Sequence, residues 1–109
     1  MVKGQVNVAQ FDIYKTDLEL APLLLEVQSN LLSGLDTKVV IPLIENKKST
    51  PEQLARLHPI VNIEGTEYII RTAELGAVPK SLLTNKVSNI EDQYRQKIID
   101  ALDFLILGF

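Results

Sequence analysis

The chain lacks cysteine and tryptophan, and it carries a single histidine, His58. The absence of cysteine excludes disulfide scaffolds, zinc ribbons, thiol catalysis and covalent haem attachment. The 14 acidic residues outnumber the 11 basic ones, and a net charge of −3 argues against binding nucleic acid through bulk positive charge. The longest apolar runs, Leu23–Leu25 and Phe104–Leu107, are far shorter than the roughly 20 residues that a membrane span needs.

Residues typical of enzyme active sites are also scarce. The sequence contains no HExxH, no glycine-rich phosphate loop and no GxSxG motif. His58 has no nucleophile or metal ligand beside it in Leu57-His58-Pro59, which favours a half-buried or exposed loop histidine. We therefore expect no catalytic residues, no metal site, no cofactor and no enzymatic activity.

The composition is that of a folded soluble chain. It has 109 residues, of which 46% are hydrophobic and 23% charged, as expected for one small domain with one core. The first ten residues contain no apolar run, so they do not resemble a signal peptide, and we expect a cytoplasmic protein. The prediction is a single domain over residues 1–109, with residues 1–8 as an extra leader or an added edge strand.

Alternating and β-branched patterns predict about five strands. They fall at residues 11–14, 23–28, 38–44, 60–63 and 66–71, with a short, irregular strand at 77–83. Pro42 has no N–H to donate, which predicts that its strand lies at an edge or bulges. Glu64 and Gly65 between two β-rich runs predict a hairpin. Pro51 after a Ser-Thr pair predicts one or two helical turns over residues 51–57.

The end of the chain has helical periodicity. Ser88-Asn89-Ile90-Glu91 matches a capping box, and apolar residues then recur at helical spacing to Leu105. These features predict a helix of about 18–20 residues that ends at Gly108, with Glu91 and Arg95 as an i,i+4 ion pair. The predicted fold class is mainly β with a C-terminal α-helix, as a small antiparallel barrel or curled sheet.

The last turns of this helix conflict with two local rules. Asp100 and Asp103 lie where the helix dipole disfavours negative charge. Residues 104–107 are apolar all round, and one helix face cannot bury four consecutive side chains. One interpretation is a homodimer interface, or docking of this end on the chain's own core. The other is an acidic, apolar tip that binds a partner bearing a basic group and a hydrophobic pocket.

Six motifs together point to a known family. They are Gln10–Tyr14, Val27–Leu32, Val39–Leu43, His58–Ile63, Ala77–Pro79 and the terminal Leu107-Gly108-Phe109. In this order and spacing they resemble the CcdB toxins of bacterial toxin–antitoxin modules. The resemblance covers the chain from about residue 9 to its end.

The resemblance implies a two-fold homodimer of SH3-like barrels, each with a C-terminal helix. It also implies a toxin that binds the DNA gyrase A subunit and traps the complex of gyrase with cleaved DNA. A CcdA-like antitoxin is the implied second partner, with no direct binding of nucleic acid by the toxin alone. The residues that it assigns to gyrase binding are Ser29, Leu31, Leu32, Asp103, Leu107, Gly108 and Phe109.

Leu107 stands where some members of the family carry a tryptophan that stacks on a gyrase arginine. Leucine cannot make that cation–π contact, which is worth about 0.5–2 kcal/mol. Two alternatives therefore stay open. The first is an endoribonuclease toxin of the related MazF class, with Arg71 as the phosphate-binding cation and His58 as the other candidate residue. The second is an interaction module that uses the helix tip for self-association and no longer poisons gyrase.

Overall fold

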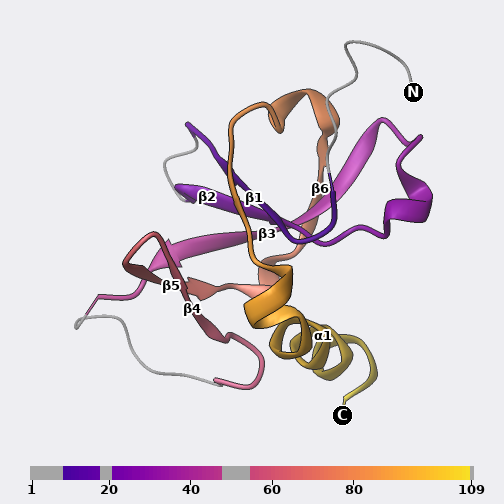
Figure 1. Ribbon diagram of the computed structural model, residues 1–109. Coiled ribbons are helices and arrows are strands. Elements are labelled where there is room, and N and C mark those ends of the chain that lie inside the picture. Colours follow the sequence, from indigo (N-terminus) through magenta and orange to yellow (C-terminus); the bar gives the residue numbers. More distant parts are fainter. Residues whose placement is uncertain (1–8, 18–20, 48–54, 109) are drawn as a thin grey trace.

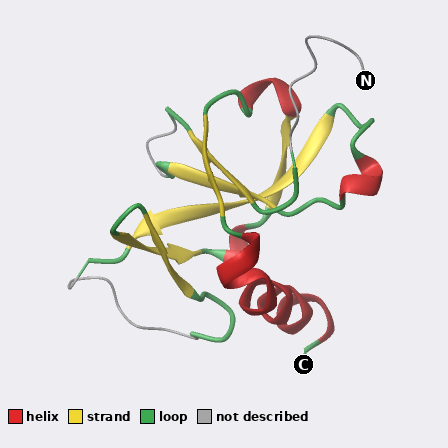
Figure 2. Ribbon diagram, in the orientation of Figure 1, coloured by secondary structure: helices red, strands yellow, loops and turns green. Residues whose placement is uncertain are grey.

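The computed structural model describes residues 9–17, 21–47 and 55–108. These residues form a curled antiparallel sheet and one C-terminal α-helix, with three short 3-10 helices in the connections (Figures 1 and 2). The strands are β1 (Asp12–Lys15), β2 (Leu23–Glu26), β3 (Thr37–Glu45), β4 (Ile60–Ile63), β5 (Thr66–Ile70), β6 (Gly76–Pro79) and β7 (Lys86–Asn89). The helices are η1 (Asn30–Leu32), η2 (Thr72–Glu74), η3 (Lys80–Leu82) and α1 (Glu91–Leu107).

β3 organises the sheet because it is long enough to pair with different strands along its two halves. The strand order is β4-β5-β3-β2-β1-β7, and β6 pairs with β3 off this path. β3 pairs with β6 over residues 37–40 and with β5 over residues 43–45. The sheet therefore curls into a half-barrel (Figure 1), and the predicted class of a mainly β fold with a C-terminal helix is confirmed.

Pro42 lies in the interior of this sheet, so the prediction of an edge strand was wrong. On one side it is opposite Leu24 of β2. On the other side it falls between the end of the β6 pairing at Val40 and the start of the β5 pairing at Leu43. A missing N–H is tolerated at this change of partner, and the Pro42 carbonyl still accepts a hydrogen bond from the Arg71 amide at 3.0 Å.

The predicted hairpin is confirmed as β4 and β5. Its two central residues, Glu64 and Gly65, have φ values of 53° and 87°. Positive φ at both positions defines the type I′ turn, whose twist matches that of the flanking strands. The hairpin extends the sheet beyond β3, and the β4 amide of Asn62 donates to the Tyr94 hydroxyl of α1 at 2.9 Å.

The helix is confirmed, but its predicted capping box is wrong. α1 has 17 residues, its N-cap is Ile90 and no side chain caps it there. Ser88 lies in β7 opposite Ile13, so it is occupied by strand pairing. The Asn89 side-chain oxygen instead accepts from the Glu91 amide at 3.0 Å. The predicted pair of Glu91 and Arg95 is present at 3.7 Å.

Two other predicted elements differ from the structure. β6 ends at Pro79 and gives way to η3, so the predicted strand does not continue to residue 83. Of the predicted helix at 51–57, residues 51–54 lie outside the described residues and residues 55–57 form a turn. The proposed leader, residues 1–8, also lies outside the described part of the chain.

Both faces of the sheet are buried. The larger core lies between one face and α1, where Ile90 and Ile98 join strand residues such as Leu25 and Ile41. The smaller core, on the other face, contains Tyr14, Ala21, Leu24, Val40 and Leu83. Among the described residues, five polar ones are buried as well, namely Asp12, Glu26, Gln28, Lys38 and Thr72.

Candidate functional site

The C-terminal end of α1 exposes the apolar residues that the sequence singled out. Ile106 and Leu107 are 69% and 59% exposed, whereas Ile98 and Ala101 earlier in the helix are buried. The helix ends at Gly108, which has a φ of 81° and donates to the carbonyls of Asp103 and Phe104. The expectation that these consecutive apolar side chains cannot all be buried within the chain is confirmed. We call Asp103, Ile106, Leu107 and Gly108 the α1 tip; Phe109 lies outside the described residues.

A cation lies beside the α1 tip. The Arg56 guanidinium is 4.5 Å from the centre of the Phe104 ring, which is a favourable cation–π distance. Phe104 is half-buried, while Asp103 on the same turn is exposed. The tip therefore combines apolar side chains with an exposed carboxylate. Sequence reasoning missed Arg56, because nothing local to its loop indicates that it reaches the helix.

A second exposed apolar surface surrounds η1. Leu31 is 95% exposed, and Leu32 and Leu35 are each 49% exposed. Ser29 caps this short helix, since its hydroxyl accepts from the Leu31 amide at 3.2 Å. We call Ser29, Leu31, Leu32 and Leu35 the η1 tip.

The chain does not bring its two tips together. Figure 1 shows η1 at one end of the sheet and the C-terminal end of α1 at another. The residues that the family resemblance assigns to one partner therefore form two separate surfaces on a single chain.

The two ribonuclease candidates do lie close together. The His58 Nε2 atom accepts from the Ala73 amide at 3.4 Å, and the Arg71 guanidinium pairs with the Glu74 carboxylate at 2.6 Å. Burial lowers the pKa of His58 below 6.5, the nearby Arg71 lowers it further, and Glu74 acts in the opposite direction. The imidazole is thus held neutral near a guanidinium whose charge is already paired.

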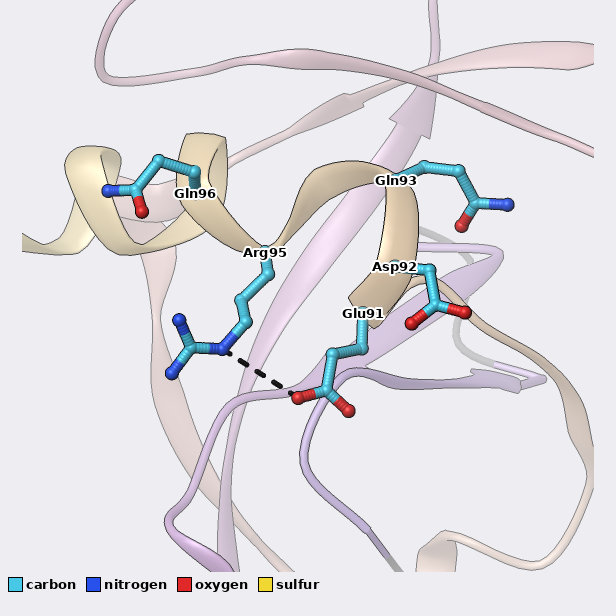
Figure 3. Close-up of a pocket in the computed structure, with 5 residues that line it drawn as sticks. All are labelled: Glu91, Asp92, Gln93, Arg95 and Gln96. Atoms are coloured by element: carbon cyan, nitrogen blue, oxygen red, sulfur yellow. Dashed lines mark ion pairs between the residues drawn. The ribbon is translucent and has the colours of Figure 1, made fainter.

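A surface hollow on the first turns of α1 has only polar side chains along its wall. It is lined by Glu91, Asp92, Gln93, Arg95 and Gln96, and its Glu91–Arg95 ion pair is drawn in Figure 3. All five side chains are exposed. Within the described ranges, no three histidine, aspartate or glutamate side chains gather closely enough to hold a metal ion. No helix among these residues is long and apolar enough to cross a membrane.

Asp12 is the centre of a buried polar cluster that ties β1 to β7. Its carboxylate accepts from the Ala9 amide at 2.8 Å, the Tyr14 hydroxyl at 3.0 Å and the Asn89 amide group at 2.9 Å. Lys86 adds an ion pair at 3.1 Å. Burial alone would raise the pKa of Asp12, but these hydrogen bonds outweigh it and hold the pKa below 3.8. The cluster also neighbours η1, because Asn89 donates to the Gln10 carbonyl and the Gln10 amide donates to the Asn30 side-chain oxygen at 2.8 Å.

Beneath η1 lies a second buried polar group. Glu26 and Lys38 are each 2% exposed, and one carboxylate oxygen of Glu26 has no hydrogen-bond partner. Burial raises the pKa of Glu26 to about 7, although the positive charge of Lys38 opposes the rise. Glu26 and Gln28 alternate with Leu25 along the chain and lie on the opposite face of the sheet, and this face is buried too.

The Glu26 carboxyl makes stability depend on pH. A folded-state pKa of about 7 against an ordinary value of 4.5 means that the folded chain binds the proton more tightly. The stability that this proton supplies is complete below about pH 4.5 and is lost as pH rises through 7. As pH rises from 5 to 8, the wild-type chain is expected to lose about 2–3 kcal/mol of folding stability through Glu26. The Glu26→Gln variant should not show this loss. Urea unfolding of both proteins at several pH values measures this difference, and parallel pH profiles would contradict it.

Comparison with known proteins identifies the family and the fold. A family model described as CcdB protein matches residues 10–108. The structure is similar to a mycobacterial endoribonuclease in complex with its cognate antitoxin, with a TM-score of 0.73 and 17% identity over 94% of this chain and 97% of that chain. It is also similar to an endoribonuclease from a mycobacterial species, with a TM-score of 0.71 and 19% identity over 98% and 97%. A search of curated proteins gave no significant match.

Proposed function

Because this chain belongs to the CcdB family, we propose that it is the toxin of a toxin–antitoxin module and that it poisons DNA gyrase. In this proposal it binds the gyrase A subunit in the cytoplasm and traps gyrase on cleaved DNA, without catalysis or a cofactor of its own. The observation that carries the proposal is the exposure of Leu31 and Leu107. Large exposed aliphatic side chains at the positions that the family resemblance assigns to gyrase are suited to fill pockets on a partner.

The separation of the two tips supports a homodimer as the binding form. In a two-fold dimer each tip occurs twice, so a tip of one protomer is able to meet a tip of its partner across the axis. Ile106, Leu107 and the η1 leucines then form one composite apolar surface for gyrase. Sedimentation of the purified chain at micromolar concentration is expected to show a dimer, and a monomer would contradict this part of the proposal.

A CcdA-like antitoxin is the second proposed partner. Support comes from the fold, since one of the similar structures was solved in complex with its cognate antitoxin. Family membership points the same way. Co-expression with the antitoxin should restore growth, and titration should give a stable complex.

The decisive experiment adds the purified chain to gyrase, supercoiled DNA and ATP, followed by denaturation and proteolysis. Trapped cleavage complexes yield linear DNA under these conditions. We expect linear DNA whose amount rises with the concentration of the chain. An unchanged distribution of DNA forms, with active gyrase and folded protein, would overturn the gyrase part of the proposal.

A second candidate function is RNA cleavage. The observation that favours it is the proximity of His58 and Arg71, in a fold similar to two endoribonucleases. Cleavage requires a base that removes the proton of a 2′-hydroxyl and a cation that binds the phosphate. Here His58 Nε2 already accepts from Ala73, and Arg71 is paired with Glu74. Sequence-specific cuts in purified RNA that disappear in His58→Ala would establish this function; intact RNA is the result expected from the gyrase proposal.

A further inference from the structure

η1 is held from below by two buried polar side chains. The Lys38 ammonium donates to the Ser33 carbonyl at 3.2 Å and to the Leu32 carbonyl at 3.5 Å. The Gln28 amide group also donates to the Leu32 carbonyl at 3.2 Å, and its oxygen accepts from the Val39 amide at 3.2 Å. Lys38 thus connects β3 to the carbonyls at the end of η1. Gln28 does the same for the segment that follows β2.

Besides these bonds, one other non-local hydrogen bond reaches η1, from the Gln10 amide to the Asn30 side-chain oxygen at 2.8 Å. None of its three residues is buried, and the 95% exposure of Leu31 means that this side chain adds almost no packing energy. The remaining bonds are local ones, such as those from the Leu32 amide to the Ser29 carbonyl and from the Ser33 amide to the Asn30 carbonyl. A single turn with such bonds alone is marginal in water.

Burying an ammonium group is costly unless it is paired or hydrogen-bonded. The two carbonyls satisfy part of the Lys38 ammonium, and Glu26 lies close enough for the charge of Lys38 to lower its pKa. A methionine or leucine would fill the same space in the sheet without that cost. A lysine at this position donates hydrogen bonds to η1, and an apolar residue cannot.

We propose that Lys38 is a positioning residue, whose buried ammonium fixes η1 so that Leu31 and Leu32 form a preformed contact surface. The inference rests on the proposed function, which assigns this surface to gyrase. A surface that is already ordered loses less conformational entropy on binding. Lys38 is buried, and it acts through η1.

The test is Lys38→Met in the full chain, with two measurements. The first is amide hydrogen exchange at Leu32, Ser33 and Leu35, compared with Ile41 in β3. We expect exchange at the amides of Leu32, Ser33 and Leu35 to accelerate at least tenfold, with a smaller change at Ile41. The second is binding to purified gyrase A subunit, for which we expect about a tenfold loss of affinity.

Glu26→Gln is the matched control, because it changes the neighbouring buried charge but keeps the Lys38 bonds to η1. It should leave exchange at Leu32 and Ser33 unchanged. If Lys38→Met does not fold, the double variant Glu26→Gln/Lys38→Met removes the buried unpaired carboxylate and gives the same test. Unchanged η1 exchange in the lysine variant, or equal acceleration in Glu26→Gln, would overturn the proposal.

The exchange measurement also separates the two proposals. Failure of the wild-type chain to bind gyrase A would overturn the proposed function, while the exchange result would still decide the role of Lys38. Leu31→Ser provides the opposite control. It should weaken binding to gyrase A without accelerating exchange in η1, and accelerated exchange in that variant would mean that Leu31 itself holds the turn.

Discussion

Replacing Leu107 by serine is expected to abolish growth inhibition and to remove most of the linear DNA formed in the gyrase assay. Leu107 is 59% exposed, so its truncation changes folding stability by no more than about 0.5 kcal/mol. Truncating a central interface side chain costs about 2 kcal/mol or more, which corresponds to about a 30-fold loss of affinity. Leu31→Ser on the η1 tip should act in the same direction, because the proposal uses both tips on one target.

Leu82→Ser is the matched control for this prediction. Leu82 is 51% exposed and also lies at the end of a helix, η3, but it belongs to neither tip. The control should keep full toxicity and full formation of linear DNA. A toxic Leu107→Ser variant would remove the α1 tip from the mechanism. Equal loss of toxicity in Leu82→Ser would show that the effect is not specific to the tips.

The parts of the fold that follow from local patterns could be predicted from the sequence. The hairpin follows from Glu64 and Gly65, which supply two positive φ values between β-rich runs. α1 follows from its periodicity. The start of α1 could not be predicted, because Ser88 fits either a cap or a strand, and only the pairing with Ile13 in β1 decides for the strand. The position of Pro42 depends on a change of partner along β3, which is likewise non-local.

The candidate site, too, could be predicted from the sequence only in part. The α1 tip was evident from four consecutive apolar residues in one helix, whereas the η1 tip came from the family resemblance. Lys38 lies in a strand and is followed by two valines. From the sequence, a lysine in such a strand is expected to face the solvent. It is buried because the face that carries it also packs against Val78 and Leu83, which come from later in the chain. The stacking of Arg56 on Phe104 is equally invisible, since the two residues are far apart in sequence.

Asp12→Ala is expected to be the most destabilising single substitution among the polar residues discussed above. It removes the acceptor of three hydrogen bonds and one ion pair at a fully buried position. The Tyr14 hydroxyl then loses its partner inside the protein, where such a loss costs about 1–3 kcal/mol, whereas the exposed Asn89 amide group keeps its bond to the Gln10 carbonyl. We expect a total loss of about 2–4 kcal/mol, measured by urea unfolding at pH 7. Asp103→Ala, at an exposed position near the negative end of α1, should be neutral or slightly stabilising.

The pH profile distinguishes loss of the Asp12 charge from loss of packing. Its pKa lies below 3.8 in the folded chain, so its contribution is present above about pH 4 and is lost as pH falls through the folded-state value. Wild type should therefore lose stability in acid, and Asp12→Asn, which keeps the size of the side chain, should lose that acid-dependent part. If Asp12→Asn keeps the same loss of stability below pH 4 as wild type, another carboxylate is responsible for it. Because Glu26 titrates with the opposite sign and at higher pH, the two buried carboxyls together place maximum stability between their pKa values. The pH of maximum stability is therefore expected to be mildly acidic. The net charge of −3 alone does not predict this.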